Sequence, residues 1–391
     1  MFVSAHSTLL DTDAALRLVL LQLSEKLTGP ATFAVVFSTI EHASAFEQIA
    51  AAVTKQLGTQ HIIGCTAETV VANDVECEGE PCLVVWAAQI PNMTVVPIVF
   101  DFQNTPGGPA IRGWPEELAT FADEGSTMLL LGEPFTFPTD LLLEKLRENR
   151  PALAVYGGMA SAAQEQGRNR LLLGKTVHKR GAVGLFLHAE PACNIAITGV
   201  VSQGCRPIGP TFIVTKAERN SIEQLAGKPA LLRLQEVFAE LSETDQALAR
   251  RGLHVGCAMS EYRDEFERGD FLIRNVVGAE PDSGSIAIGG DVRVGQTVRF
   301  HLRDAATADE DLMLLLATAK EQGAAQAALL FTCNGRGTRL FPEPNHDAEA
   351  VQKVLGTVPV AGLFAMGEIG PVGGQNYVHG FTASIAVFRK T

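Results

Sequence analysis

Residues 33–64 read FAVVFSTIEHASAFEQIAAAVTKQLGTQHIIG, in which two apolar runs flank an amphipathic stretch. The runs Phe33–Ser38 and His61–Gly64 have the length and the composition of short β-strands. The apolar residues between them recur at helical spacing, at Phe46, Ile49, Ala50, Val53 and Leu57. This order of strand, helix and strand favours a right-handed parallel crossover.

Two further segments repeat this order, and in all three a later apolar run follows a polar or Gly-rich loop. The second segment consists of residues 128–131, 139–149, 154–156 and 181–187. The third consists of residues 327–332, 347–355, 358–364 and 381–388, and the later run of the first segment is 83–88. The later strand is expected to return antiparallel. We therefore predict an α/β (mixed α+β) fold of repeated β-α-β-β units that form mixed sheets.

Two helices are preceded by patterns typical of a capping box, in which a hydroxyl and a carboxylate three residues later bond to backbone N–H groups. Ser44 with Glu47 predicts the start of the first helix, which Gly58 ends. Thr307 with Glu310 predicts the start of another helix further along the chain.

The pattern changes between the second and third segments. Short β runs at residues 271–277, 285–289 and 297–302 are separated by Gly, Asp and Pro turns, which we interpret as a meander. At 391 residues the chain also exceeds the usual size of one core. We therefore predict two domains, residues 1–191 and 192–391.

The composition argues against several function classes. Hydrophobic residues are 46% and charged residues 19%, as in ordinary globular proteins. The net charge of -13, without a basic run, argues against binding to nucleic acid or to a membrane surface. Met1–Leu10 lacks the features of a signal peptide, and runs such as Leu312–Ala317 are too short to span a membrane, so we expect a cytoplasmic protein. Seven cysteines at irregular spacing predict reduced thiols.

Standard signatures of catalysis and metal binding do not occur in the sequence. Gly167 and Gly174-Lys175-Thr176 resemble a phosphate loop, but six residues separate the glycines where the motif requires four. His61 and Cys65 flank a probable buried strand, which favours a packed histidine and thiol over a pair of metal ligands. We expect no cofactor, no metal and no catalysis.

Four loops at strand ends are candidates for binding a small molecule, at residues 64–68, 156–161, 333–337 and 367–374. Ligands of α/β sheets usually lie at the carboxyl ends of strands, where glycines let backbone amides approach them. Tight turns without a ligand would also explain each loop by itself. The candidate residues are Gly64, Cys65, Thr66, Gly157, Gly158, Cys333, Asn334, Arg336, Gly367, Glu368, Gly370 and His379.

Arg336 and Glu368 are the sharpest of these candidates. An exposed ion pair, worth little in stability, would explain their presence. If they converge in a pocket, Arg336 could hold a carboxylate with two hydrogen bonds and Glu368 could hold an ammonium group. A free amino acid needs that arrangement.

Cys333 and Cys65 both follow apolar strands, where a cysteine is usually a small buried hydrophobe. A stabilised thiolate there would be a nucleophile or a redox sensor. His379 could act as a base for Cys333, donate to a ligand or make a structural hydrogen bond. An uncharacterised enzyme that uses Cys333, Glu368 and His379 is therefore an alternative to a binding protein.

Five segments resemble the FIST family of sensory proteins, which has an N-terminal and a C-terminal FIST domain. They are Ile62–Thr66, Tyr156–Gly158 with Gly181–Leu185, Pro207–Pro210 leading to Val214-Thr215, Phe331–Arg336, and Gly362–Pro371. The Cys-x-x-Arg of Cys333–Arg336 and the Gly-Glu-Ile-Gly-Pro of Gly367–Pro371 are the most specific. The first loop lacks Gly-Glu-Ile, so Glu368 matches the family pattern better than Glu68 does.

The resemblance implies a sensor that binds small ligands such as amino acids and has a signalling protein as a partner. In eukaryotes such a region is joined to an F-box in ubiquitin-ligase adaptors, so a protein-interaction module is a further alternative. Because the resemblance begins by about Phe33, we expect a stand-alone version without an appended F-box or kinase domain.

Overall fold

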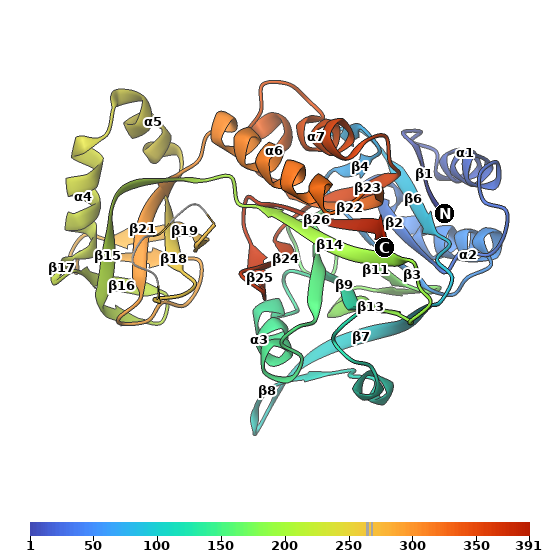
Figure 1. Cartoon of the computed structure of the whole chain (residues 1–391), viewed down its shortest axis with the longest axis horizontal. Coiled ribbons are helices and arrows are strands. Elements are labelled where there is room, and N and C mark those ends of the chain that lie inside the picture. Colours follow the sequence, from blue (N-terminus) through green and yellow to red (C-terminus); the bar gives the residue numbers. More distant parts are fainter. Residues whose placement is uncertain (263–265, 267–268) are drawn as a thin grey trace. The chain divides into compact units, whose positions relative to one another are not determined.

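The structure is a computed structural model and describes residues 1–262, 266 and 269–391. The chain forms two compact units, one of Met1–Val201 with Met313–Thr391 and one of Ser202–Leu312. The helix α6 (Ala305–Glu321) runs from the second unit into the first (Figure 1). These units are compact bodies and not the two domains predicted along the sequence, so the predicted domain boundary between residues 191 and 192 stays a prediction.

Three copies of one repeat build the first unit and confirm the mixed α/β fold. The first contains β1 (Phe2–Ser7), α1 (Thr12–Ser24), β2 (Phe33–Ser38), α2 (Phe46–Leu57), β3 (Ile62–Thr66), β4 (Val70–Ala72), β5 (Val75–Cys77) and β6 (Leu83–Ala88). The second contains β7 (Met93–Thr105), β8 (Gly108–Arg112), β9 (Ser126–Gly132), α3 (Thr139–Asn149), β10 (Ala154–Met159), β11 (Leu171–Leu173), β12 (Thr176–His178) and β13 (Ala182–Ala189). The third contains β14 (Ile195–Ser202), β22 (Ala325–Cys333), α7 (His346–Leu355), β23 (Val360–Ala365), β24 (Glu368–Val372), β25 (Gln375–His379) and β26 (Ala383–Lys390).

Strand pairing within the repeats is as predicted. The strands on either side of each helix are parallel, in the pairs β2–β3, β9–β10 and β22–β23. The last strand of each repeat returns antiparallel, in the pairs β6–β2, β13–β9 and β26–β22. The first strand of each repeat, β1, β7 or β14, lies beside that last strand.

A hairpin follows the second parallel strand of each repeat and joins the sheet of another repeat. The hairpin β4–β5 pairs with β23, β11–β12 pairs with β3, and β24–β25 pairs with β10. This exchange is cyclic, so the three repeats have equivalent positions in one threefold topology. The sequence had predicted loops in place of these hairpins.

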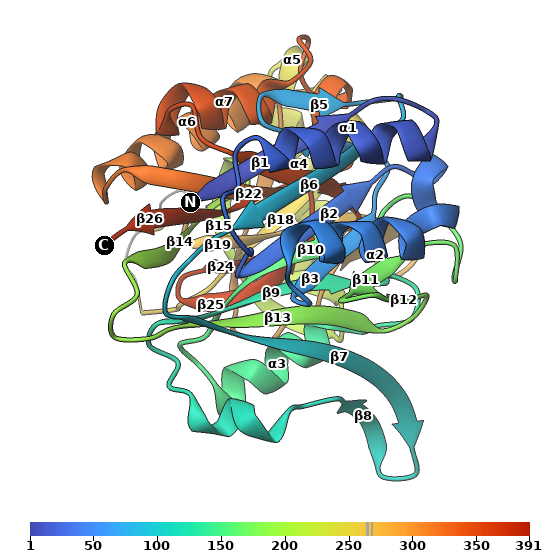
Figure 2. The same cartoon turned by 90° about the vertical axis from the view of Figure 1, so that its right-hand side faces the viewer.

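The three sheets share one apolar core, and helices cover their outer faces. Residues of all three sheets meet in this core, where the Trp86 ring packs against Phe33, Phe2 and Phe388 at centroid distances of 5.2 to 5.6 Å. Helices α1 and α2 cover the first sheet, α3 the second and α7 the third (Figures 1 and 2). A strand buried on both faces needs a continuous apolar run, which explains the sequence of β2.

Both predicted capping boxes are wrong. Ser44 lies inside a 3-10 turn, η1 (Ile40–Ala45), and α2 begins behind Ala45 without a side-chain cap. The helix α6 begins before Thr307, and Asp304 Oδ1 accepts the Thr307 N–H at 2.7 Å. The predicted end of α2 is confirmed, because Gly58 has a left-handed φ of 62°.

The second unit is an antiparallel barrel with its own core. Its strands are β15 (Arg206–Glu218), β16 (Ser221–Leu225), β17 (Lys228–Pro229), β18 (His254–Ala258), β19 (Phe271–Glu280), β20 (Ser285–Ile288) and β21 (Thr297–Leu302), with helices α4 (Ala230–Glu240) and α5 (Glu243–Arg251). Pairing of β15 with both β21 and β16 closes the barrel. The meander is confirmed for β19–β20 and wrong for β21, which lies between β15 and β18 instead of beside β20.

Candidate functional site

Close packing between parallel strands explains a glycine at the same position in each of the three repeats. Gly64, Gly157 and Gly362 occupy equivalent positions, each opposite a residue of the neighbouring parallel strand. A Cβ atom there would lie 2.1, 1.8 and 2.0 Å from the backbone oxygen of that residue. Glycine is therefore required for strand packing at these positions, and a contact of Gly64 or Gly157 with a ligand stays a prediction.

The loops behind these strands meet one another inside the first unit. Ser161 Oγ accepts the N–H of Glu68 at 3.0 Å and donates to the backbone oxygen of Phe364. Cys65 and Thr66 are fully buried, and burial raises the pKa of the Cys65 thiol far above its usual range. Thr66 Oγ1 accepts the Arg170 N–H at 2.9 Å. In this conformation the first loop presents no accessible thiol.

Arg336 does not lie at an open mouth but in the interior, where its side chain is 0% exposed. Its Nε and Nη2 atoms donate to the two carboxylate oxygens of Asp347, each at 2.7 Å. Burial by itself would raise the pKa of Asp347, but the charge and hydrogen bonds of Arg336 outweigh it and hold that pKa well below its usual range. The fork expected to hold a ligand carboxylate is therefore engaged within the protein.

Glu76 of β5 completes this buried polar cluster. Its Oε1 atom accepts the N–H groups of Asp347 and Ala348 at 2.9 and 3.0 Å, at the start of α7. Burial, reinforced by the charge of Asp347, raises the pKa of Glu76 to about 8. An exchanged hairpin of the first repeat thus caps a helix of the third.

Glu368 and His379 face each other across the β24–β25 hairpin. Both are buried, Glu368 Oε2 accepts the Thr382 N–H at 2.8 Å, and His379 Nε2 donates to the Gly370 oxygen at 2.9 Å. The structural hydrogen bond considered for His379 therefore exists. A Cβ atom on Gly370 would lie 2.5 Å from Ser384 Oγ, so this glycine permits close packing.

The equivalent positions of the other two repeats are not acidic. The pair Glu368–His379 corresponds to Val70–Cys77 on β4–β5 and to Leu171–His178 on β11–β12. Val70 and Leu171 are fully buried, as Glu368 is. Val70, and not Glu68, is thus the counterpart of Glu368. The fold accepts an aliphatic side chain at this position in two of its three copies.

Residues 333–335 form a half-buried loop next to Glu368. The Cys333 N–H donates to the Thr382 oxygen at 3.0 Å, which links this loop to the residue that donates to Glu368. Cys333 Sγ accepts the Gly335 N–H at 3.4 Å. The side-chain oxygen of Asn334 is buried without a hydrogen-bond partner among the described residues. This loop therefore offers an acceptor to which no described residue donates.

Phe381 stands out in this region because it has a left-handed φ of 62°. A bulky side chain in that conformation costs about 1–3 kcal/mol, and such residues cluster at functional sites. Its ring packs over Gly335, where a Cβ atom would lie 2.3 Å from the ring. Sequence reasoning missed Phe381, although the Gly380-Phe381 step directly precedes a strand.

Arg339 is a second residue that the sequence reading missed. It donates to the backbone oxygen of Asn334 at 2.8 Å and forms an exposed ion pair with Glu68. It therefore fixes the half-buried loop from outside. Of the predicted candidates, the structure brings together Cys333, Asn334, Gly367, Glu368, Gly370 and His379, and Gly158 of β10 lies opposite Glu368 in the sheet. Gly64, Cys65 and Thr66 lie in β3 and Gly157 lies in β10, all buried, and Arg336 pairs with Asp347.

The described residues contain no group of three or more His, Cys, Asp or Glu side chains with the geometry to hold a metal ion. None of the helices in the described part of the chain is long and apolar enough to cross a membrane.

Comparison with known proteins gives similarity over most of the chain. Family models for the FIST N domain and the FIST C domain match residues 32–228 and 230–371. The uncharacterised protein Mb0898c of Mycobacterium bovis is 41% identical over 370 residues, which cover 94% of this chain and 93% of that protein. The uncharacterised protein Rv0628c of Mycobacterium tuberculosis is 41% identical over 362 residues, 92% of each chain.

Proposed function

Since this chain belongs to the FIST family, whose domains are associated with sensing in signal transduction, we propose that it is a sensory protein that binds a small amine-bearing metabolite, such as an amino acid, at Glu368. The observation that carries the proposal is a buried carboxylate where the same fold twice buries an aliphatic side chain. Burial of a polar carboxyl group costs free energy that burial of an aliphatic side chain does not, which supports a role for Glu368 beyond folding.

The surroundings of Glu368 suit an ammonium group. A primary ammonium has three N–H donors, and Glu368 together with Asn334 Oδ1 would accept from it. The carboxylate of an amino acid would need a separate donor, because Arg336 gives its fork to Asp347. The amine is therefore the group whose recognition the site supports best, and selectivity for amino acids over other amines is the finer part of the proposal.

Entry of the ligand requires an opening, because Glu368 is 0% exposed. The strained Phe381, whose ring covers Gly335, is the element that would move, since leaving the left-handed conformation releases strain. Opening upon binding would also change the surface around Phe381, and a signalling partner could recognise that change. We assign the protein to the cytoplasm and assign no catalytic step to the site.

Calorimetry with a panel of primary amines, amino acids and dicarboxylates tests the proposal. Glu368→Leu copies the residue of the second repeat, so it should still fold, with a loss of about 1–3 kcal/mol because the Thr382 N–H loses its acceptor. It should lose amine binding at least tenfold, about 1.4 kcal/mol. Glu368→Gln, which keeps the shape and removes the charge, should lose binding as well. Silence across the panel with wild-type protein, or unchanged binding by Glu368→Leu, would sink the proposal.

Two other functions predict different results. An enzyme that uses Cys333 would lose this thiol rapidly to iodoacetamide near neutral pH, and a substrate-like compound would protect it. A protein-interaction module would capture a partner chain with equal efficiency in the presence and absence of amines.

A further inference from the structure

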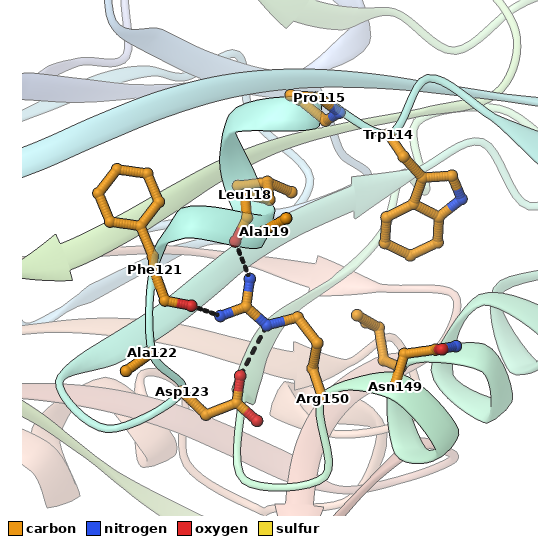
Figure 3. A pocket seen from close by; sticks show the side chains of 10 residues that line it. Trp114, Pro115, Leu118, Ala119, Phe121, Ala122, Asp123, Asn149 and Arg150 are labelled. Carbon is orange, nitrogen blue, oxygen red and sulfur yellow. Dashed lines mark hydrogen bonds and ion pairs between the residues drawn. The ribbon is translucent and has the colours of Figure 1, made fainter.

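A cavity of about 650 Å³ lies in the second repeat between the segment 114–123 and the end of α3, and its lining includes none of the residues around Glu368. Its lining residues are Trp114, Pro115, Leu118, Ala119, Phe121, Ala122, Asp123, Leu146, Asn149 and Arg150 (Figure 3). Pockets for small molecules usually measure about 300–1,000 Å³ and are mainly apolar with a few polar groups. This cavity has the size and the lining of such a pocket.

Arg150 holds the segment 114–123 in place. Its Nε donates to Asp123 Oδ1 at 2.6 Å, and its two Nη atoms donate to the backbone oxygens of Leu118 and Phe121 at 2.8 and 2.6 Å (Figure 3). The guanidinium also stacks on Phe186 at 5.1 Å. The charges of Arg150 and Asp123 thus neutralise each other within the wall of the cavity.

Trp114 is fixed but remains accessible. Gly113 precedes it with a φ of 99°, and a Cβ atom on Gly113 would lie 1.8 Å from the Val99 oxygen, so only glycine permits this close approach. The Trp114 ring packs edge-on against Phe100 at 4.9 Å and is 38% exposed. Its indole N–H has no acceptor among the described residues, whereas the buried Trp86 donates to the Pro359 oxygen.

The remaining charges near the cavity determine which ligands it accepts. The segment carries Glu116 and Glu117 on a 3-10 turn, η2 (Glu116–Thr120), and Glu124 follows Asp123. Arg112 precedes the segment, and α3 carries Glu144 and Glu148 besides Lys145 and Arg147, so carboxylates outnumber cations here. These carboxylates repel anions, and the one lining cation, Arg150, is already paired. The exposed amide of Asn149 offers polar contacts without a charge.

We infer that this cavity is a second ligand site, which takes an uncharged ring-bearing molecule with a hydrogen-bond acceptor for the Trp114 indole N–H. The flat ring of the ligand packs against the indole and the aliphatic side chains of Leu118 and Leu146. Anionic analogues of the same shape are excluded by the acidic segment.

Benzamide and benzoate are matched probes, because they have nearly the same shape and differ in charge. Ligand-observed saturation-transfer NMR should show saturable binding of benzamide to the full chain in the millimolar range, and none of benzoate. The variant Trp86→Phe leaves Trp114 as the only tryptophan, so a saturable change in its emission would place benzamide at the cavity.

Two variants test the location. Trp114→Ala should weaken benzamide binding at least about tenfold, and Ala119→Phe, which fills the cavity from an exposed position, should abolish it. Glu368→Leu should leave it unchanged, so this site and the amine site fail or succeed independently. Equal binding of benzoate, or binding by Ala119→Phe as tight as by wild type, would overturn the inference.

Discussion

Replacement of Arg336 by alanine should destabilise the protein strongly, because it leaves the carboxylate of Asp347 buried with 1% of its side chain exposed. Removal of one partner from a buried ion pair typically costs about 3–5 kcal/mol. Hydrogen bonds from Thr332 Oγ1 at 2.5 Å and from His346 at 2.9 Å remain and moderate the loss. Loss of the contact between the guanidinium and the Phe341 ring at 5.1 Å adds about 0.5–2 kcal/mol.

We therefore expect a loss of about 4 kcal/mol, measured by urea unfolding, and a fall in Tm on the order of 10 °C. Arg339→Ala is the matched control, because Arg339 also pairs with a carboxylate but is 58% exposed. Exposed pairs contribute about 0–1 kcal/mol, so this variant should unfold nearly as wild type does.

A double variant separates the pair from the shape of the site. Arg336→Met with Asp347→Leu removes both charges and fills similar volume, and it should recover most of the stability lost by Arg336→Ala. Equal losses for Arg336→Ala and Arg339→Ala would refute the assignment of Arg336 to the interior. That result would return Arg336 to the open site that sequence reasoning proposed.

Three further predictions concern the first unit. Because the pKa of Glu76 is raised to about 8, the folded chain binds more protons than the unfolded chain between about pH 4.5 and 8. The free energy of unfolding should therefore fall by a few kcal/mol as pH rises through this window. In thermal melts Glu76→Gln should remove this pH dependence, whereas the exposed control Glu80→Gln should keep it. Gly362→Ala should abolish soluble folded protein because its Cβ would lie 2.0 Å from a backbone oxygen, whereas Gly278→Ala, which meets nothing within 4 Å, should express normally. A fragment of residues 1–191 should show no cooperative unfolding by circular dichroism, since β10 would lack β24 and β4 would lack β23; a sigmoidal transition would contradict the hairpin exchange.

The repeated unit could be predicted from sequence because its central strands are buried on both faces and therefore read as continuous apolar runs. The exchanged hairpins could not be predicted in this way. The strands β4 and β5 are three residues each, and Asn73-Asp74 between them resembles an ordinary polar loop. The partner strand of β4 is β23, nearly 300 residues away, and a local pattern holds no information about such a partner.

The candidate site was predicted in part, for a similar reason. Its residues follow strand ends, which sequence shows, but burial and pairing depend on distant groups. Asp347 was expected only as the first residue of a helix, and nothing in its neighbourhood indicates that its side chain faces Arg336. The two predicted capping boxes were also wrong because of structure outside the motif. The chain before Ala45 already forms a 3-10 turn, and Asp304 supplies the cap of α6.

The threefold repeat supplies a comparison that a single sequence ordinarily lacks, because each position of the fold is present three times in one chain. Where the three copies agree, as at Gly64, Gly157 and Gly362, the backbone geometry explains the residue. Where one copy departs toward a group that is costly to bury, hydrogen bonds within the fold or a ligand must account for it. Glu368 departs from Val70 and Leu171 in this sense.

A position at which all three repeats differ lies next to Glu368. Cys333 corresponds to Thr39 and Glu133, because the N–H of each donates to the residue just before the returning strand of its own repeat. The carboxylate of Glu133 forms hydrogen bonds with nearby residues, because it accepts the Phe135 N–H at 3.1 Å and the Thr136 hydroxyl at 2.7 Å. In the third repeat this position instead holds a half-buried thiol beside the strained Phe381. This half-buried thiol therefore lies next to Glu368, at the site for which we propose amine binding.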